Sequence, residues 1–228
     1  MKAHSVRTLL AGSAALLLAC GDAAGPAVDR NDPGTGTGTL SVIADVEGQQ
    51  IVGGMETVMD VELRDAQGAP VSGATVTIDN NTAGTTTLFE TGAGTGDYTA
   101  TINGFAAGDY RLDVVSNTDR VENVVVGGIG VHTIDNPLLA DTVTADSLLM
   151  VTWSRPAEGF RADVESRNYE AQDILDTGSH TIPAVDVRAR SDERIRVTRY
   201  NEVAIAGGVA GSRLRLRVRR ETEPILVQ

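Results

Sequence analysis

The segment Val61-Glu62-Leu63-Arg64-Asp65-Ala66-Gln67-Gly68-Ala69-Pro70-Val71-Ser72-Gly73-Ala74-Thr75-Val76 holds two alternating runs with a break between them. Val61 and Leu63 fall on one side of an extended chain, and Ala74 and Val76 repeat this spacing. A two-residue period predicts β-strands with one buried face. Residues 65–70 combine Asp, Gly and Pro, which favour turns. The segment therefore predicts two strands joined by a tight turn.

The same pattern recurs on both sides of this segment. Strands are predicted at residues 40–46, 57–63, 74–79, 85–89, 98–102, 110–115 and 121–126, separated by Gly, Asp and Asn clusters. Many short strands with frequent turns favour an antiparallel sandwich. No stretch keeps a 3.6-residue period, so little or no helix is expected in the mature chain.

Residues 65–76 fit the pattern D-x-x-G-x-P-V-x-G-A-x-V and resemble a hairpin of bacterial Ig-like domains, of the invasin and carboxypeptidase-regulatory-like types. Gly96-Asp97-Tyr98 and Gly108-Asp109-Tyr110 are similar to the strand starts of the same modules. The resemblance implies an Ig-like β-sandwich over residues 39–134. It implies nothing about activity, because such a fold hosts many functions.

Residues 147–156 resemble the tryptophan-bearing strand of fibronectin type III domains. Val151 and Trp153 share a face, which predicts a buried tryptophan. Further strands are predicted at residues 160–165, 195–201 and 213–219, and Ile195 stands where such domains carry a tyrosine. The resemblance implies a second sandwich over residues 137–228. The fold class is therefore all-β: two tandem Ig-like and fibronectin-like antiparallel β-sandwiches after a signal peptide and a flexible tether.

The amino-terminal region predicts export. Residues 1–19 combine a basic start with an apolar run at 9–19, which is typical of a signal peptide and too short to span a bilayer. The run ends at Cys20, the single cysteine. Residues 17–20 (Leu-Leu-Ala-Cys) resemble a bacterial lipobox, which implies that Cys20 is acylated and binds membrane lipid. The alternative is a cysteine that merely follows an ordinary cleavage site.

The lipobox resemblance also implies a location. Gly21, rather than Asp, follows the cysteine, which in lipoproteins of bacteria with two membranes implies the outer membrane, facing the periplasm or the surface. Residues 20–38 hold almost no large apolar side chain and end in alternating Gly and Thr. They are expected to form a flexible tether between the lipid and the sandwiches.

Composition and motifs exclude several functions. The net charge is −12, from 31 acidic and 19 basic residues, which argues against general nucleic-acid binding. Asp176-Thr177-Gly178 matches the aspartic-protease tripeptide, but that chemistry needs two such aspartates, so a β-turn is favoured. His132 and His180 fit no zinc motif. Oxygen-rich clusters near residues 79–81 and 109–119 leave calcium open beside ordinary turn chemistry. No enzyme activity, metal or cofactor is expected.

One strand concentrates positive charge. Arg213, Arg215, Arg217 and Arg219 alternate with apolar residues and should share an outward face. Residues 188–220 hold ten arginines against three acidic residues, a net of +7. The face predicts binding of an anion or an acidic partner. The alternative is a solvated strand neutralised by neighbouring carboxylates, whose charge protects a sheet edge.

These observations predict a membrane-anchored envelope lipoprotein that acts as a non-catalytic binding or scaffolding module. Its partner would be another envelope protein or a glycan. Two alternatives stay open at this point: a purely structural spacer at the membrane, and an enzyme whose site has no recognisable motif.

Overall fold

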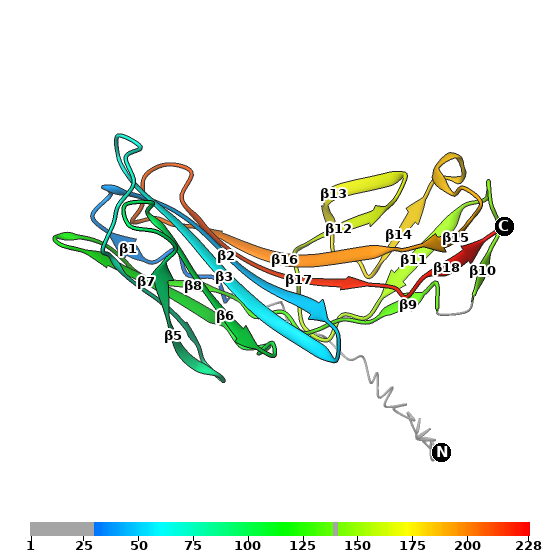
Figure 1. Ribbon diagram of the computed structural model, residues 1–228, viewed down its shortest axis with the longest axis horizontal. Helices are drawn as coiled ribbons and strands as arrows, with labels where there is room; N and C mark the ends of the chain where they lie inside the picture. The colour runs from blue at the N-terminus through cyan, green and yellow to red at the C-terminus, as the bar shows by residue number, and fades with distance from the viewer. Residues whose placement is uncertain (1–29, 139–140) are drawn as a thin grey trace, which may run out of the picture.

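The computed structural model describes residues 30–138 and 141–228 (Figure 1). Residues 1–19, Cys20 and the tether up to residue 29 lie outside the described residues. The described chain forms two lobes made almost wholly of strands, with a single 3-10 turn at Ala184–Asp186. The predicted all-β fold is confirmed.

The first lobe holds β1 to β8. Their bounds are β1 Thr35–Gly36, β2 Leu40–Ile51, β3 Gly54–Asp65, β4 Thr75–Asn80, β5 Gly84–Glu90, β6 Asp97–Asn103, β7 Tyr110–Ser116 and β8 Asp119–Val126. One layer is β2-β3-β6 and the other is β4-β7-β8 with β1 at its edge, while β5 bonds to both β4 and β6. The enclosed core consists mainly of Val, Leu, Ile and Tyr side chains from both layers, together with Ala44 and Met59.

The segment that opened the sequence analysis forms β3 and β4, as the alternation predicts. The two strands do not pair along their length. β3 bonds to β2 and β6, whereas β4 bonds to β5 and β7. Asp65 closes the turn, since its Oδ1 accepts the backbone N–H groups of Gln67 and Ala69, both at 2.9 Å. The segment starts as a short hairpin, in which Arg64 bridges Pro70 and Val71 N donates to Leu63 O at 3.1 Å, and the chain then crosses to the other layer at β4.

The second lobe holds the remaining strands. Their bounds are β9 Ile134–Asn136, β10 Thr142–Val143, β11 Leu149–Trp153, β12 Arg161–Ser166, β13 Tyr169–Leu175, β14 Ser179–Ile182, β15 Arg190–Glu193, β16 Arg196–Ala204, β17 Arg213–Glu221 and β18 Ile225–Val227. The sheet β14-β11-β9 belongs to this lobe, together with β17-β16-β12-β13 and the small sheet β10-β18-β15. Val151 and Trp153 are buried in the second core, as predicted.

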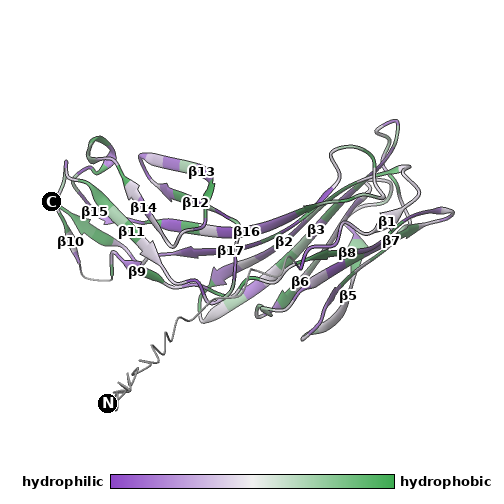
Figure 2. Cartoon of the chain, turned by 180° about the vertical axis from the view of Figure 1, so that it is seen from behind, coloured by the Kyte–Doolittle hydropathy of each residue, from purple (hydrophilic) through white to green (hydrophobic). Residues whose placement is uncertain are grey.

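Two long strands belong to both lobes. β16 pairs with β12 of the second lobe, and β17 pairs in parallel with β2 of the first, from Arg213 opposite Ile43 to Arg219 opposite Gln49. One continuous sheet of 12 strands results, and Figure 1 shows β16 and β17 running between the lobes. Figure 2 shows purple, hydrophilic segments along these two strands.

Each core takes side chains from these shared strands. Val203 and Ile205 of the β16 end, with Leu214, Leu216 and Val218 of β17, lie in the first core. Ile195 and Val197 lie in the second. The division into domains at 39–134 and 137–228 stays a prediction. The structure adds that residues after 137 complete the core of the first lobe.

Residues 30–38 fell within the predicted tether, and here the structure differs. β1 pairs with β8, Asp32 bridges Val125, and Gly38 N donates to Gly207 O at 2.9 Å. A Cβ added at Gly36 would lie 2.4 Å from Gly207 O, so glycine permits close backbone packing at this point. The glycines that suggested flexibility hold this segment against the first lobe.

Candidate binding face

The predicted arginines lie on a surface that we call the charged face. It is the outward side of four neighbouring strands and consists of Asp45, Glu47 and Gln49 of β2, Arg213, Arg215, Arg217 and Arg219 of β17, Thr198, Tyr200 and Glu202 of β16, and Arg161, Asp163 and Glu165 of β12. The alternation predicted for β17 is confirmed, because Leu214, Leu216 and Val218 point into the core. The four arginines therefore share one face.

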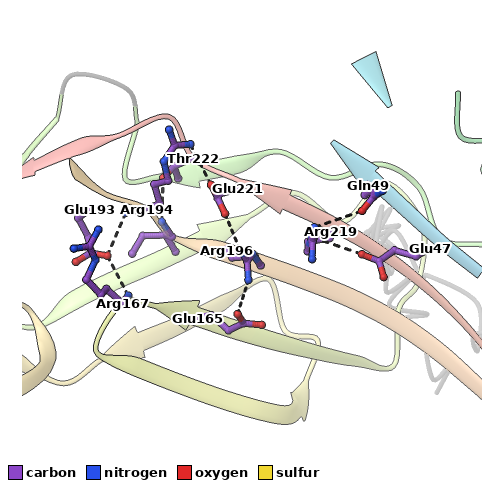
Figure 3. A network of polar contacts seen from close by, with 11 residues as sticks. Glu47, Gln49, Glu165, Arg167, Glu193, Arg194, Arg196, Arg219, Glu221 and Thr222 are labelled. Carbon is purple, nitrogen blue, oxygen red and sulfur yellow. Dashed lines mark hydrogen bonds and ion pairs between the residues drawn. The ribbon is translucent and has the colours of Figure 1, made fainter. Parts of the chain in front are cut away.

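Carboxylates from both neighbouring strands lie opposite these arginines. Arg215 Nη2 lies 2.6 Å from Glu202 Oε2, and Arg217 Nε lies 2.8 Å from Glu47 Oε2. Arg213 lies 3.5 Å from Glu202. Arg219 lies 3.6 Å from Glu47, and Figure 3 shows it directed toward Glu47 and Gln49. All four arginines are half-buried.

The pairing changes what the arginines can do. Burial acts to lower the pKa of Arg215, but the hydrogen bond and charge of Glu202 outweigh it and raise the pKa. The carboxylates that the alternative interpretation required are thus present. The sheet edge that it supposed is not, since β17 is paired on both sides. Binding of an anion or acidic partner by this face stays a prediction.

The charged face is hollowed around Tyr200. A depression of about 580 Å³ is lined by Phe160, Arg161, Asp163, Gln172, Asp173, Tyr200, Glu202 and Arg215. Tyr200 Oη donates to Asp173 Oδ1 at 2.9 Å, and Arg215 Cζ lies 5.2 Å from the tyrosine ring centroid. Burial, followed by the interaction with Asp173, raises the pKa of Tyr200. The depression offers donors, acceptors and one half-exposed aromatic ring, that of Phe160.

A second polar cluster continues the charged face toward the second lobe. Figure 3 shows Arg196 between Glu165 and Glu221. Its Nη1 lies 2.8 Å from Glu165 and its Nη2 lies 3.0 Å from Glu221. Burial acts to lower the pKa of Arg196, and the hydrogen bond to Glu221 raises it by more. In this cluster the Arg196 cation lies between two carboxylates, one from β12 and one from β17.

Asp176, from the protease-like tripeptide, is bound by two buried side chains. Its Oδ2 accepts from Arg199 Nε at 2.7 Å, and its Oδ1 accepts from Trp153 Nε1 at 2.8 Å. The side chains of Asp176 and Arg199 are fully buried. Gly178 follows with φ +84°, a left-handed conformation that favours glycine. The tripeptide is a turn that anchors a buried ion pair.

The two histidines also have contacts within the protein. His132 is buried, its Nε2 lies 3.1 Å from Val197 O, and burial lowers its pKa to about 3. His180 Nε2 lies 2.7 Å from Tyr169 Oη, and burial lowers its pKa. Within residues 30–138 and 141–228, no group of three or more His, Cys, Asp or Glu side chains could hold a metal ion.

The side-chain oxygens of the oxygen-rich clusters accept hydrogen bonds from backbone N–H groups. Asn80 Oδ1 accepts from Thr82 N and Ala83 N at 3.0 and 2.9 Å. Asp109 Oδ1 accepts from Gly128 N at 2.8 Å and pairs with Arg30 at 2.7 Å. The Asn80 contacts are the short-range kind by which Asn stabilises a turn, whereas Asp109 joins three separate segments of the first lobe.

Sequence reasoning missed the acidic half of the charged face. Asp45 and Glu47 alternate with apolar residues in a predicted strand, so their outward direction was readable. Their position beside Arg217 was not, because β2 and β17 are far apart in the chain and pair in parallel. Cys20 lies outside the described residues, and its acylation stays a prediction.

No family model matches this chain, and no curated protein matches it. Among solved structures, the fibronectin(III)-like modules of Clostridium thermocellum CbhA are 18% identical, with a TM-score of 0.27, and the match covers 82% of this chain and 94% of that one. The Yersinia pseudotuberculosis adhesin InvE is 16% identical, with a TM-score of 0.28, and the match covers 80% of this chain and 60% of that one. Among the described residues, no helix has the length and hydropathy needed to cross a membrane.

Proposed function

We propose that this chain is a lipid-anchored, non-catalytic scaffolding module of the cell envelope, which presents the charged face to another envelope protein or a glycan. The observation that carries the proposal is the pair of strands shared between the lobes. Since β16 pairs with β12 and with β17, and β17 pairs in turn with β2, the lobes are joined by continuous hydrogen-bonded backbone rather than by a linker. A module built in this way holds its surfaces at a fixed separation.

The chemistry of the charged face supports a specific partner over a generic anion. The arginines of β17 are opposed by Glu47 and Glu202, so the face alternates in sign instead of forming one positive field. Such a surface selects a partner by matching charges in register, which gives specificity more than bulk attraction. The depression around Tyr200 adds donors and acceptors suited to a polar ligand such as a sugar.

The same ion pairs favour a second candidate function. A face whose cations are already neutralised suits a spacer that stays soluble and does not bind. The two candidates differ in one outcome, because only the binding module loses a partner when the charge pattern is altered.

The experiment is crosslinking in cells that carry the intact chain, followed by pull-down. A variant with Arg215→Gln and Arg217→Gln changes the centre of the charged face. The matched control carries Arg111→Gln and Arg120→Gln, which remove two ion-paired arginines of the first lobe. A partner captured by the control and lost by the first variant supports the binding module. Equal capture by both variants excludes the charged face as the binding site. An absence of specific capture favours the spacer.

The anchor is tested separately. The mature chain should carry acyl groups on Cys20, visible as added mass, and Cys20→Ser should move the protein from the membrane fraction to the soluble fraction of the envelope. An unmodified Cys20 would overturn the lipid anchor and leave the scaffolding proposal standing.

A further inference from the structure

The turn between β2 and β3 is unusual in composition. It reads Ile51-Val52-Gly53-Gly54, with no polar side chain, whereas surface turns normally carry Asn, Asp or Ser beside Gly. Val52 is fully exposed at 104%, and Ile51 is 39% exposed. Figure 1 shows this hairpin end at the middle of the molecule, on the side opposite the β12–β13 hairpin. An exposed apolar tip of this kind is a candidate contact surface for another molecule.

A second apolar residue and a group of arginines lie behind the tip. A surface depression is lined by residues 50–53, by Arg194, Arg219 and Arg220, and by residues 221–223. A neighbouring depression shares Gln50 and Arg220 and adds Leu138, which is 55% exposed. The apolar side chains at 51, 52 and 138 therefore border a charged region, which holds three arginines together with Glu221 and Glu223.

Arg220 is the residue of this region that points to an anionic partner. Arg194 pairs with Glu221 at 3.1 Å and Arg219 with Glu47 at 3.6 Å. Arg220 forms no ion pair with a carboxylate in the part of the chain that the structure describes. Its one hydrogen bond there runs from Nη1 to Met55 Sδ, at 3.5 Å. A guanidinium without a carboxylate keeps its full capacity for bidentate binding of phosphate oxygens.

We propose that the Ile51–Gly54 tip inserts into the interface of a lipid bilayer, with Arg220 and its neighbours on anionic headgroups. Apolar side chains that enter the headgroup boundary, together with arginines at headgroup level, are the two components of interfacial membrane binding. The long arginine side chain can keep its charge at the phosphates while its stem lies along the apolar tip.

The place where the described chain begins supports this occupant. Arg30 Nη2 donates to Gly128 O at 2.7 Å, and Gly128 lies against the carbonyls of Ala107 and Gly108. Phe105, from the same loop, covers Gly48 of β2, three residues before the tip. Arg30 therefore lies at the end of the first lobe that carries the tip.

This step rests on the proposed function, because it uses acylated Cys20. Nine residues separate Cys20 from Arg30, and the ten Cα–Cα steps between them span at most about 35 Å in an extended chain. The tip can thus reach the bilayer in which the acyl chains sit. The contact would lay the long axis of the molecule along the membrane instead of letting the lobes stand away from it.

The test separates the tip from the anchor. The parent is the full chain with Cys20→Ser, which removes the acylation site and keeps every other residue. Flotation is measured with vesicles of phosphatidylcholine containing phosphatidylglycerol, and with vesicles of phosphatidylcholine alone. Val52→Asp and Arg220→Gln are added to the parent one at a time. The matched control is Ala83→Asp, which places a carboxylate on the exposed turn between β4 and β5.

Val52→Asp is expected to lower partitioning into anionic vesicles about tenfold or more, since it puts a charge in place of the apolar group that would enter the bilayer. Arg220→Gln should lower it by several-fold and only in the anionic vesicles. Ala83→Asp should change nothing. Equal flotation of the parent and Val52→Asp overturns the proposal and assigns the tip to a protein partner. Failure of the anchor alone appears instead as an unmodified Cys20 in the intact chain, whatever the tip does.

Discussion

The hairpins β7–β8 and β12–β13, in different lobes, carry the same irregularity. Asp113 Oδ1 accepts the N–H of Asn123 at 2.7 Å, and Asp163 Oδ1 accepts the N–H of Asp173 at 2.8 Å. In each case the donor lies ten residues on, at φ of 59° and 53°, and the strand register shifts at that point. Both hairpins thus use an aspartate to hold a β-bulge whose residue is left-handed.

The strands next to these hairpins also match. Val76, Thr77 and Ile78 of β4 pair with Val114, Asp113 and Leu112, as Val197, Thr198 and Arg199 of β16 pair with Val164, Asp163 and Ala162. The equivalence extends to the ends of the hairpins. Tyr110 lies opposite Val126, and Asp176 N donates to Phe160 O at 3.3 Å.

The instructive difference lies at two of these equivalent positions. The first lobe has Ile78 and Val126, both in its hydrophobic core. The second lobe has Arg199 and Asp176, a buried ion pair. The same backbone frame therefore accepts either an apolar pair or an ionic one. Desolvation offsets most of the attraction in a buried ion pair, so its presence says more about specificity than about stability.

Removing half of the ion pair should give the largest effect. Asp176→Ala leaves the Arg199 guanidinium buried without its carboxylate, which costs about 3–5 kcal/mol of unfolding free energy. The double variant Arg199→Ile, Asp176→Val copies the first lobe and should recover most of that loss. Urea unfolding followed by Trp153 fluorescence reports on the second lobe, because this is the single tryptophan of the chain. A loss below about 1 kcal/mol for Asp176→Ala would show that the two positions are not equivalent.

Low pH should give the next largest effect, because it should lower the stability of the second lobe more than that of the first. Tyrosines apart, the buried side chains of the described residues that can carry charge are His132, Asp176, Glu193 and Arg199, all beyond the first lobe. Burial lowers the folded pKa of His132 to about 3, from 6.5. The unfolded chain therefore binds the proton first, and stability present above pH 6.5 is lost as the pH falls toward 3. At pH 5 the loss from this group is about 2 kcal/mol.

The measurement is the unfolding free energy of the second lobe between pH 7.5 and pH 5, for the wild type and for His132→Gln. The glutamine does not titrate in this range, so the pH slope should flatten. Equal slopes in the two proteins would assign the acid sensitivity to other groups.

The bulge itself should give a smaller and symmetrical effect. Asp113→Ala and Asp163→Ala each remove the acceptor of one backbone N–H, which costs about 1 kcal/mol. Asp→Asn at the same positions keeps an acceptor and should restore most of the stability. Chemical denaturation of both pairs of variants checks this. A large effect in one hairpin only would show that the same bulge contributes differently to the unfolding free energy of the two lobes.

The surface ion pairs should give the smallest effect on stability. Arg215 and Arg217 are half-buried, and pairs of this kind contribute about 0–1 kcal/mol. Arg217→Gln should therefore lower the melting temperature only slightly, and less in high salt. A large, salt-independent loss would instead indicate that β17 depends on these pairs to join the lobes.

Local alternation was sufficient to predict most strands. Val151 and Trp153, or Leu214, Leu216 and Val218, need no distant partner to reveal which face is buried. The sequence pattern does not indicate which distant strands pair with one another. Nothing local in Asp45 and Glu47 indicates that they lie beside Arg217, and nothing in Asp176 indicates Arg199.

Glycine was the other source of error, because flexibility and close packing require the same residue. Gly36 and Gly207 lie so close that a Cβ on Gly207 would fall 2.0 Å from Gly36 N. A sequence that reads as a tether can therefore be a packed segment, and the distinction lies in a partner more than a hundred residues away.

The pairing of β17 with β2 has a consequence for how the molecule is made. Leu40 and Val42 sit at the start of the first lobe, yet Leu214 and Leu216 complete its core. A contact order this high slows folding, since distant segments must meet before either gains stability. During synthesis, the core of the first lobe stays incomplete until residues 213–219 emerge. A chain that stalls before residue 213 would leave β2 as an exposed edge, available to aggregate or to be captured by a chaperone.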